Sequence, residues 1–139
     1  MDYLVSVVIP TKNRQTYCIK AIDQILGLHD ENIQIVIQDN SDDDAVEKRI
    51  QQIHSPSIAY RHAEGVISFV DNFSEAMQSV KGEYVCFIGD DDGALPVITQ
   101  AALYAKEHHN DAVIPSLGAV YFWPSLKPLV KNGENGYLN

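Results

Sequence analysis

The chain has 139 residues, a length that suits one compact domain better than two. Its 45% hydrophobic and 21% charged residues are ordinary for a globular protein. The formal net charge of −9 argues against nucleic acid as a partner, because a phosphate backbone binds basic surfaces. The apolar runs are too short for a membrane span, and the first residues lack a signal-peptide pattern, so a cytoplasmic location is expected.

The cysteines and histidines do not form a metal-binding pattern. Cys18 lies on the apolar side of a helical repeat, and Cys86 lies inside an apolar run. Two such positions favour buried free thiols over a disulfide bond or a metal pair. The five histidines have no metal-ligand spacing.

Hydrophobic periodicity predicts strands that alternate with helices along the chain. Strands are expected over residues 4–9, 33–37, 57–61 and 84–88, with a fifth at 111–115 that continues over 118–122. Helices are expected over about 14–26, 44–53, 69–80 and 96–109. This order is typical of βαβ units, which build a mostly parallel sheet with helices on both faces.

Two helix starts carry specific signals. Ser41, with Asp44 three residues later, resembles a capping box that opens the second helix. Ser68 is expected to cap the third helix, which ends before Gly82. An apolar stripe on this third helix is expected to pack into the core, with Asn72 in the exposed polar stripe between its members; the stripe comprises Phe69, Phe73, Ala76, Met77 and Val80. On the fourth helix, Pro96 suits the first turn and four side chains are expected to face inward: Val97, Ala101, Ala102 and Ala105.

Polar loops follow the first, second and fourth strands, over residues 11–14, 39–44 and 90–93. In a parallel sheet the carboxyl ends of the strands share one edge, which is where ligands bind in open α/β folds. Three adjacent carboxylates, Asp90–Asp92, repel one another unless a cation joins them, and a hard divalent cation that also grips phosphates is the natural candidate. Asp39 could accept a hydrogen bond from a nucleobase. These loops therefore predict a nucleotide site.

Several of these segments together resemble the family 2 glycosyltransferases. The resemblance rests on motifs that occur in the family's order and spacing: Ser6–Arg14, Val36–Ser41, Asn72, Gly82–Val85, Asp90–Asp92 and Pro96. It implies the GT-A fold, a Rossmann-like α/β sandwich. It also implies an enzyme that transfers a sugar from a nucleoside diphosphate, with a UDP-sugar favoured, to a glycan or lipid-linked acceptor in polysaccharide or cell-surface glycan synthesis. Such an enzyme could lie at the inner face of a membrane as a peripheral protein.

The resemblance also assigns roles to residues. It places at the nucleotide Pro10, Thr11, Asn13, Arg14, Asp39 and Asp90. It gives Asp91 and Asp92 to a Mn²⁺ or Mg²⁺ ion, with Asp91 as the main ligand of the family's DxD motif. Two positions depart from the pattern: Gly89 stands where an acid is frequent, and Lys12 where an aromatic residue is common.

The end of the sequence does not match a whole enzyme. We expect residues 1–122 to form the nucleotide-sugar-binding domain, and 123–139 an irregular tail that leads to a missing acceptor-binding half. The catalytic base is expected beyond Asn139, because Glu134 sits in a Gly/Asn-rich loop. Such a chain alone is expected to bind the donor without transferring the sugar. It is also expected to expose apolar surface, which a homodimer could cover.

Two other functions stay open at this point. A non-catalytic nucleotide-sugar or metal-binding module would have the same donor loops without the second half. A receiver-like signalling domain is also doubly wound and carries acids at strand ends. It needs an acid pair after the first strand, where this chain has Pro10-Thr11-Lys12-Asn13.

Overall fold

The computed structural model describes residues 3–114 of the chain. The predicted strand over 118–122, the predicted tail over 123–139 and Glu134 therefore lie outside the described residues. Within residues 3–114, none of the helices has the length and apolar character needed to cross a membrane.

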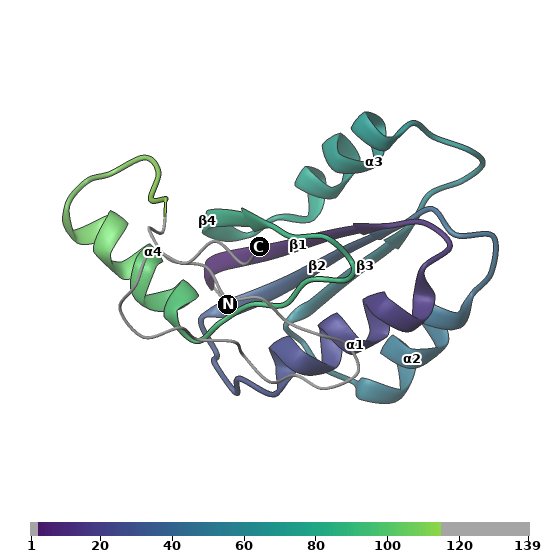
Figure 1. The fold of residues 1–139 in the computed structure, drawn as a ribbon, viewed down its shortest axis with the longest axis horizontal. Helices are drawn as coiled ribbons and strands as arrows, with labels where there is room; N and C mark the ends of the chain where they lie inside the picture. Colours follow the sequence, from purple (N-terminus) through teal and green to yellow (C-terminus); the bar gives the residue numbers. More distant parts are fainter. Residues whose placement is uncertain (1–2, 115–139) are drawn as a thin grey trace, which may run out of the picture.

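The centre of the fold is a four-stranded sheet in the order β3-β2-β1-β4, and all its pairs are parallel. Figure 1 shows β1 and β2 in the middle of this sheet. The strands are β1 (Tyr3–Thr11), β2 (Ile33–Asp39), β3 (Ile58–His62) and β4 (Gly82–Phe87). Every residue of β1 and β2 is buried, which explains why both read as continuous apolar runs. The predicted parallel α/β architecture is confirmed.

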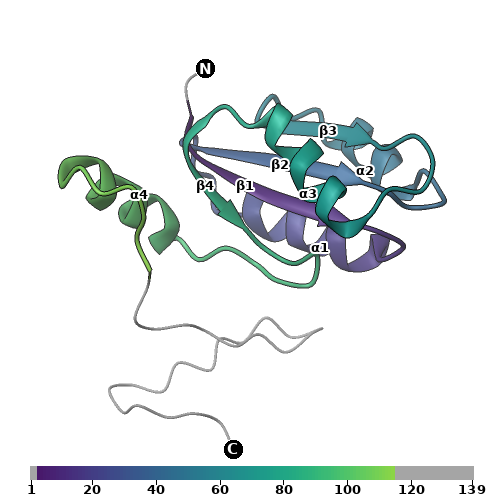
Figure 2. The same ribbon diagram turned by 90° about the horizontal axis from the view of Figure 1, so that it is seen from above.

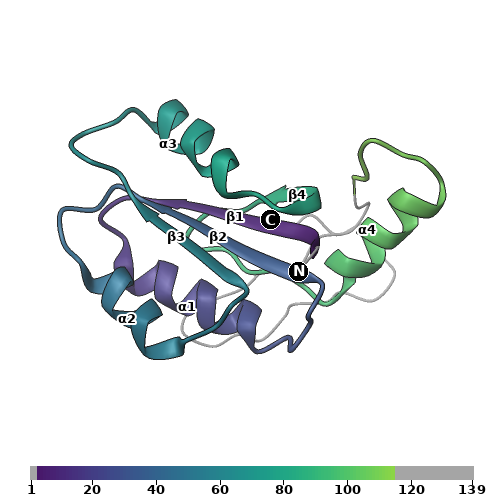
Figure 3. The same ribbon diagram turned by 180° about the vertical axis from the view of Figure 1, so that it is seen from behind.

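The helices lie on both faces of the sheet, as expected. Figures 1 and 3 show α1 and α2 against one face and α3 against the other. In Figure 2, α4 stands beyond the amino-terminal end of the sheet, beside the start of β4. The helices are α1 (Gln15–Leu26), α2 (Ala45–Ile53), α3 (Phe69–Ala76), which continues into a short 3₁₀ helix (Met77–Ser79), and α4 (Val97–Glu107).

The core divides between the two faces of β1 because successive side chains of a strand point in opposite directions. Val7 and Ile9 belong to the larger cluster, which α1 completes with Ile22. Val8 belongs to a smaller cluster that it forms with Val36 and Ala76 under α3. The main hydrophobic core therefore lies between the sheet and the α1–α2 layer.

A buried polar network joins the strands on the α3 face. The Ser6 hydroxyl donates to Gln34 Oε1 at 2.6 Å and accepts a hydrogen bond from the Gly82 N–H at 2.8 Å. Gln34 also accepts from the Lys81 N–H at 2.8 Å and donates to the Ser79 carbonyl at 3.0 Å. A Cβ atom on Gly82 would lie 2.5 Å from the Ser6 backbone nitrogen. Gly82 is thus required for the close approach of β4 to β1.

The predicted capping box at Ser41 and Asp44 is wrong. Helix α2 begins after Asp44, whose side chain makes no capping hydrogen bond. The Ser41 hydroxyl accepts a hydrogen bond from the Asn13 N–H at 2.9 Å, so it ties two loops together. Asp43 accepts from the Ala45 N–H at 3.0 Å.

Helix α3 has the predicted Ser68 cap, which accepts from the Asp71 N–H at 3.1 Å, but its buried face differs from the predicted one. Asn72 is only 5% exposed, so its predicted place in an exposed polar stripe is wrong. The predicted core stripe is confirmed for the buried Ala76 and wrong for Phe69 and Met77, which are 75% and 43% exposed. The reason is that Asn72 finds hydrogen-bond acceptors at the strand ends. The ring of Phe73 packs against two other rings. Its centroid lies 4.5 Å from that of Phe69 and 5.1 Å from that of Phe87.

Two further expectations near α4 are corrected. Val97 is half exposed, whereas Ala102 and Ala105 are buried as predicted. Residues 111–114 form no strand, so the described part of the predicted fifth strand is absent.

Strand β4 is half exposed rather than buried, because it forms the edge of the described sheet. Large apolar side chains on β4, α3 and the 3₁₀ helix remain exposed there: Val85, Phe87, Phe69, Val70 and Met77. The expected apolar surface is therefore present, and its burial in a homodimer stays a prediction.

Candidate functional site

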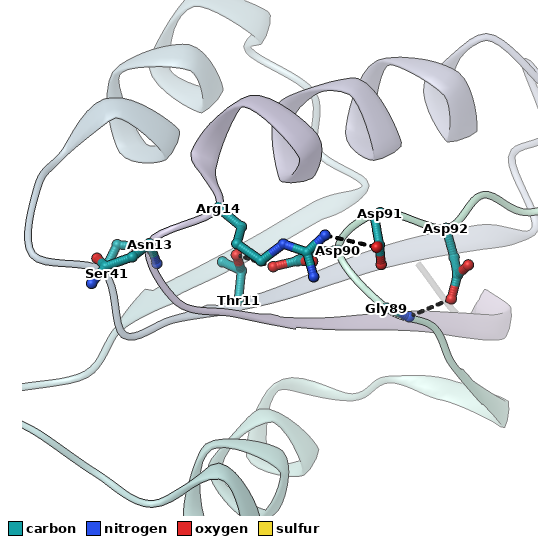
Figure 4. A network of polar contacts seen from close by, with 8 residues as sticks. All are labelled: Thr11, Asn13, Arg14, Ser41, Gly89, Asp90, Asp91 and Asp92. Atoms are coloured by element: carbon teal, nitrogen blue, oxygen red, sulfur yellow. Dashed lines mark hydrogen bonds and ion pairs between the residues drawn. The ribbon is translucent and has the colours of Figure 1, made fainter. Parts of the chain in front are cut away.

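The loops after β1 and β4 meet at the carboxyl edge of the sheet. The Thr11 hydroxyl donates to Asp90 Oδ2 at 2.8 Å, and both side chains are buried (Figure 4). Thr11 is the last residue of β1, and Asp90 follows β4 by three residues, so the parallel pairing of these strands brings them together. The contact confirms the predicted convergence of these two loops.

Arg14 joins the same cluster from the residue before α1. Its Nη2 atom is 2.7 Å from Asp91 Oδ2, and its Nη1 atom is 3.3 Å from Asp90 Oδ1. Figure 4 shows the guanidinium lying beside both carboxylates. The guanidinium carbon also lies 4.9 Å from the centre of the Tyr17 ring, which is a cation–π distance. One arginine therefore neutralises part of the charge of the acidic loop.

The two carboxylates respond differently to this environment. The hydrogen bond from Arg14 is the main reason why the pKa of Asp91 lies below its ordinary value. Burial raises the pKa of Asp90, although the Thr11 hydrogen bond and the Arg14 charge oppose that rise. Asp91 is thus a solvent-facing carboxylate, while Asp90 is a buried one whose charge depends on its two partners.

Asp92 is oriented by its own turn. Its Oδ2 atom accepts from the Gly89 N–H at 3.0 Å, as Figure 4 shows, and its N–H donates to the Gly89 carbonyl at 3.1 Å. A Cβ on Gly89 would lie 2.9 Å from an oxygen of Asp91 and from one of Asp92. Because an added side chain would displace both carboxylates, this turn suits glycine, the residue at which the sequence departs from the family pattern.

The acidic loop has the donor chemistry of a Mn²⁺ or Mg²⁺ site, since hard cations prefer carboxylate oxygens. Asp91 and Asp92 are both exposed and could supply such oxygens. Between residues 3 and 114, however, no three His, Cys, Asp or Glu side chains are grouped so that they could hold a metal ion together. The residue types therefore fit the expected cation, but the ligands are not gathered around one point.

Asp39 lies at the end of β2, directly beside Thr11 in the strand register. Its side chain is fully buried, accepting from the Ser41 N–H at 2.8 Å and from the Tyr60 hydroxyl at 3.2 Å. Burial is the main cause that raises the pKa of Tyr60 well above its ordinary value, and the negative charge of Asp39 is the second. Asp39 therefore holds this loop together, and its contact with a nucleobase stays a prediction.

Asn13 connects the first loop to the second. Its backbone has a positive φ of 56°, a conformation that asparagine tolerates better than most residues. Its side chain donates to Asp42 Oδ2 at 2.8 Å and accepts from the Asp42 N–H at 2.9 Å. Pro10, which was also predicted to line the nucleotide, is buried inside β1 beside Gln38.

Three buried amide side chains near these loops, those of Gln38, Asn40 and Asn72, were not predicted as site or core residues. Asn72 donates to the carbonyls of Thr11 and Gln38, each at 3.4 Å. Asn40 donates to the Gly65 carbonyl at 2.6 Å. Among residues 3–114, the side-chain oxygens of Gln38, Asn40 and Asn72 have no hydrogen-bond partner. For Asn72 the only sequence signal was its place in the motif order, because its position in a helical repeat predicts exposure.

Comparisons with known proteins agree with this fold and its loops. The family model described as glycosyl transferase family 2 matches residues 6–132. The WcaA protein of Escherichia coli (strain K12), named as a colanic acid biosynthesis glycosyl transferase, is 29% identical over 140 residues. This alignment covers 91% of the chain and 48% of WcaA. A glycosyltransferase of Rickettsia felis is 31% identical over 115 residues, covering 80% of the chain and 19% of that protein.

Among solved structures, S. aureus TarS has the same fold, with a TM-score of 0.60 and 20% sequence identity. The match covers 81% of the chain and 23% of TarS. The chain thus spans about half the length of WcaA and a smaller part of the other two proteins. Because the family model matches most of its residues and the GT-A-type fold agrees, this chain belongs to glycosyl transferase family 2.

Proposed function

We propose that this chain binds the nucleoside-diphosphate sugar donor of a family 2 glycosyltransferase at the carboxyl edge of its sheet. The observation that carries the proposal is the cluster formed by Thr11, Arg14, Asp90 and Asp91. These residues come from two loops far apart in the sequence, and they place both acids and a guanidinium where α/β sheets bind ligands.

Each residue has a distinct part in this proposal. Thr11 would orient the buried Asp90. The Asp90 carboxylate would then accept hydrogen bonds from the ribose hydroxyls. Asp91 and Asp92, both exposed, would hold a divalent cation. Bound there, the cation would neutralise the charge of the diphosphate leaving group. Asp39 would take the N–H of the base, with uracil favoured.

The full-length protein would then transfer the sugar to a glycan or lipid-linked acceptor. The name of WcaA, which refers to colanic acid biosynthesis, supports a role in polysaccharide synthesis. We place the catalytic base and the acceptor site beyond Asn139, so that the 139-residue chain alone is inactive in transfer. The enzyme would work in the cytoplasm, at the inner face of the membrane.

Titration calorimetry tests donor binding. The chain is titrated with UDP and with GDP, each with and without Mn²⁺, and we expect metal-dependent heat that is larger for UDP. Asp91→Ala should abolish the metal-dependent part. Asp44→Ala is the matched control, because Asp44 is an exposed acid of a neighbouring loop that pairs with Lys48 at 2.8 Å. Metal-dependent binding that survives in Asp91→Ala would contradict the site.

A non-catalytic binding module is the second candidate, favoured by the span of the chain relative to WcaA. Release of UDP from UDP-sugars, measured on the full-length protein and on this chain, separates the two. Turnover by the full-length protein alone supports the enzyme, and the absence of turnover in both supports the module. Turnover by the 139-residue chain would show that it holds the whole catalytic machinery.

A further inference from the structure

The charge balance of the acidic loop points to a role for Arg14 before any ligand arrives. The guanidinium bridges Asp90 and Asp91 at 3.3 and 2.7 Å, and therefore lies on the carboxylate proposed as the main metal ligand. A divalent cation and a guanidinium cannot both occupy the same face of one carboxylate group without repelling each other. The two cations must therefore compete for Asp91.

The geometry of Arg14 suits an exchange of this kind. Its side chain is 45% exposed and that of Asp91 is 46% exposed, so the bond between them can open toward solvent without creating a cavity. Asp90, in contrast, is only 6% exposed and is held by the Thr11 hydroxyl. The Tyr17 ring, 4.9 Å from the guanidinium carbon, offers that group a second contact that needs no carboxylate.

The exposed acids of the loop each contact a donor of the protein. Arg14 pairs with Asp91, and the Gly89 N–H donates to Asp92. Within residues 3–114 no three candidate ligands gather around one point. The acidic loop is thus satisfied by the protein's own donors.

We propose that Arg14 is a built-in counter-cation of the acidic loop, which a divalent cation displaces from Asp91 when it binds. This inference rests on the proposed function, because it assumes the cation site at Asp91. It assigns to Arg14 control over metal affinity, a role distinct from lining the nucleotide pocket. The bridge lowers the repulsion between Asp90 and Asp91 in the absence of metal, and it weakens metal binding.

Mn²⁺ binding in the absence of nucleotide tests the proposal. Arg14→Gln removes the competing charge, and we expect it to bind Mn²⁺ about fivefold more tightly than the original chain at low ionic strength. The gain should shrink at high salt, because the interaction is at the surface. Arg49→Gln is the matched control: Arg49 pairs with the exposed Asp23 at 2.7 Å, on a different part of the surface, and its removal should leave the affinity unchanged.

A second measurement uses the unmodified chain. The arginine side-chain Nε–Hε signals are followed by NMR during titration with Mg²⁺, and only that of Arg14 should move toward the position of a free arginine. Arg49 and Arg61, the other two arginines of the sequence, are internal references. A Mn²⁺ affinity that is unchanged or weaker in Arg14→Gln, or an Arg14 signal that Mg²⁺ leaves in place, would overturn the proposal.

The two hypotheses fail in different ways. If the original chain binds Mn²⁺ with UDP but Arg14→Gln binds Mn²⁺ no better, the counter-cation role is wrong and the proposed function stands. If neither protein binds Mn²⁺ or UDP, the proposed function fails together with this inference. Metal binding that appears only in Arg14→Gln would support the competition directly.

Discussion

Thr11 and Asp90 are separated by 79 positions in the sequence, yet the hydroxyl of one donates to the carboxylate of the other at 2.8 Å inside the protein. The bond joins the end of β1 to the loop after β4, and it supports the charged form of a carboxylate whose burial raises its pKa. The charge of the acidic loop is therefore linked to the correct closure of the sheet edge.

Replacing Thr11 by Val should weaken both stability and ligand binding. A lost hydrogen bond to a buried charged group costs about 1.5–3 kcal/mol, so urea unfolding at pH 7 should show a loss of this size. The pKa of Asp90 should rise further, and the pH at which half of the Mn²⁺–UDP binding is lost should rise with it. Thr16→Val, the same exchange on an exposed position of α1, should change neither property.

Replacing Asp90 by Asn should change how stability depends on pH. Because its pKa is raised on folding, the folded state holds this proton more tightly, and the contribution of Asp90 to stability is lost as the pH rises above the ordinary aspartate value of 3.8. Asp90→Asn cannot lose that proton. Its stability relative to the wild type should therefore increase as the pH is raised from 3 to 7 in urea unfolding, and a constant difference would count against the buried charge.

Replacing Gly82 by Ala should destabilise the fold because of crowding. The new methyl group would lie 2.5 Å from the Ser6 nitrogen and 2.7 Å from the Ser6 hydroxyl oxygen, so β4 must move away from β1. We expect a loss of about 1–3 kcal/mol in urea unfolding. Gly93→Ala is the comparison: its Cβ would lie 2.8 Å from Gln24 Oε1, a side-chain atom rather than strand backbone, and the loss should be smaller.

Substitutions at Asp39 and Tyr60 can distinguish an effect on loop stability from an effect on nucleotide binding. Tyr60→Phe leaves one buried carboxylate oxygen without the hydroxyl donor at 3.2 Å, and should cost about 1–2 kcal/mol of stability with little change in UDP affinity. Asp39→Ala should lower both, since the base contact is lost as well. Thermal unfolding and calorimetry measure the two effects. Equal losses of UDP affinity in both variants would show that Asp39 acts only by holding the loop.

The two thiols should react slowly in the native chain. Burial raises the pKa of Cys18 to about 12, and burial also raises the pKa of the partly exposed Cys86. Because the thiolate is the reactive form, a thiol reagent at pH 8 should modify Cys86 slowly and Cys18 more slowly still. Both should react quickly in denaturant. Rapid native modification of Cys18 would contradict its burial on the inner face of α1.

The sequence predicts the strands well because buried parallel strands are continuous apolar runs, and β1 and β2 are completely buried. It predicts α3 poorly, since the apolar period cannot show that Asn72 has carbonyl partners at the strand ends. The same limit applies to Ser41, whose partner Asn13 lies in another loop. Periodicity reports which residues are apolar, whereas the hydrogen bonds of Asn72 and Ser41 join residues that are distant in sequence.

The two sides of the site differ in how much they must change when a ligand binds. Asn13 is joined to Ser41 and Asp42 by three hydrogen bonds of 2.8–2.9 Å, so the loops on the base side are already ordered. Ordering a loop on binding costs conformational entropy. Because these loops are already ordered in the folded chain, ligand binding does not have to order them. If the proposed donor site is correct, capture of the nucleoside should therefore be fast and nearly rigid, and the exchange of cations at Asp91 would set how long the diphosphate stays bound.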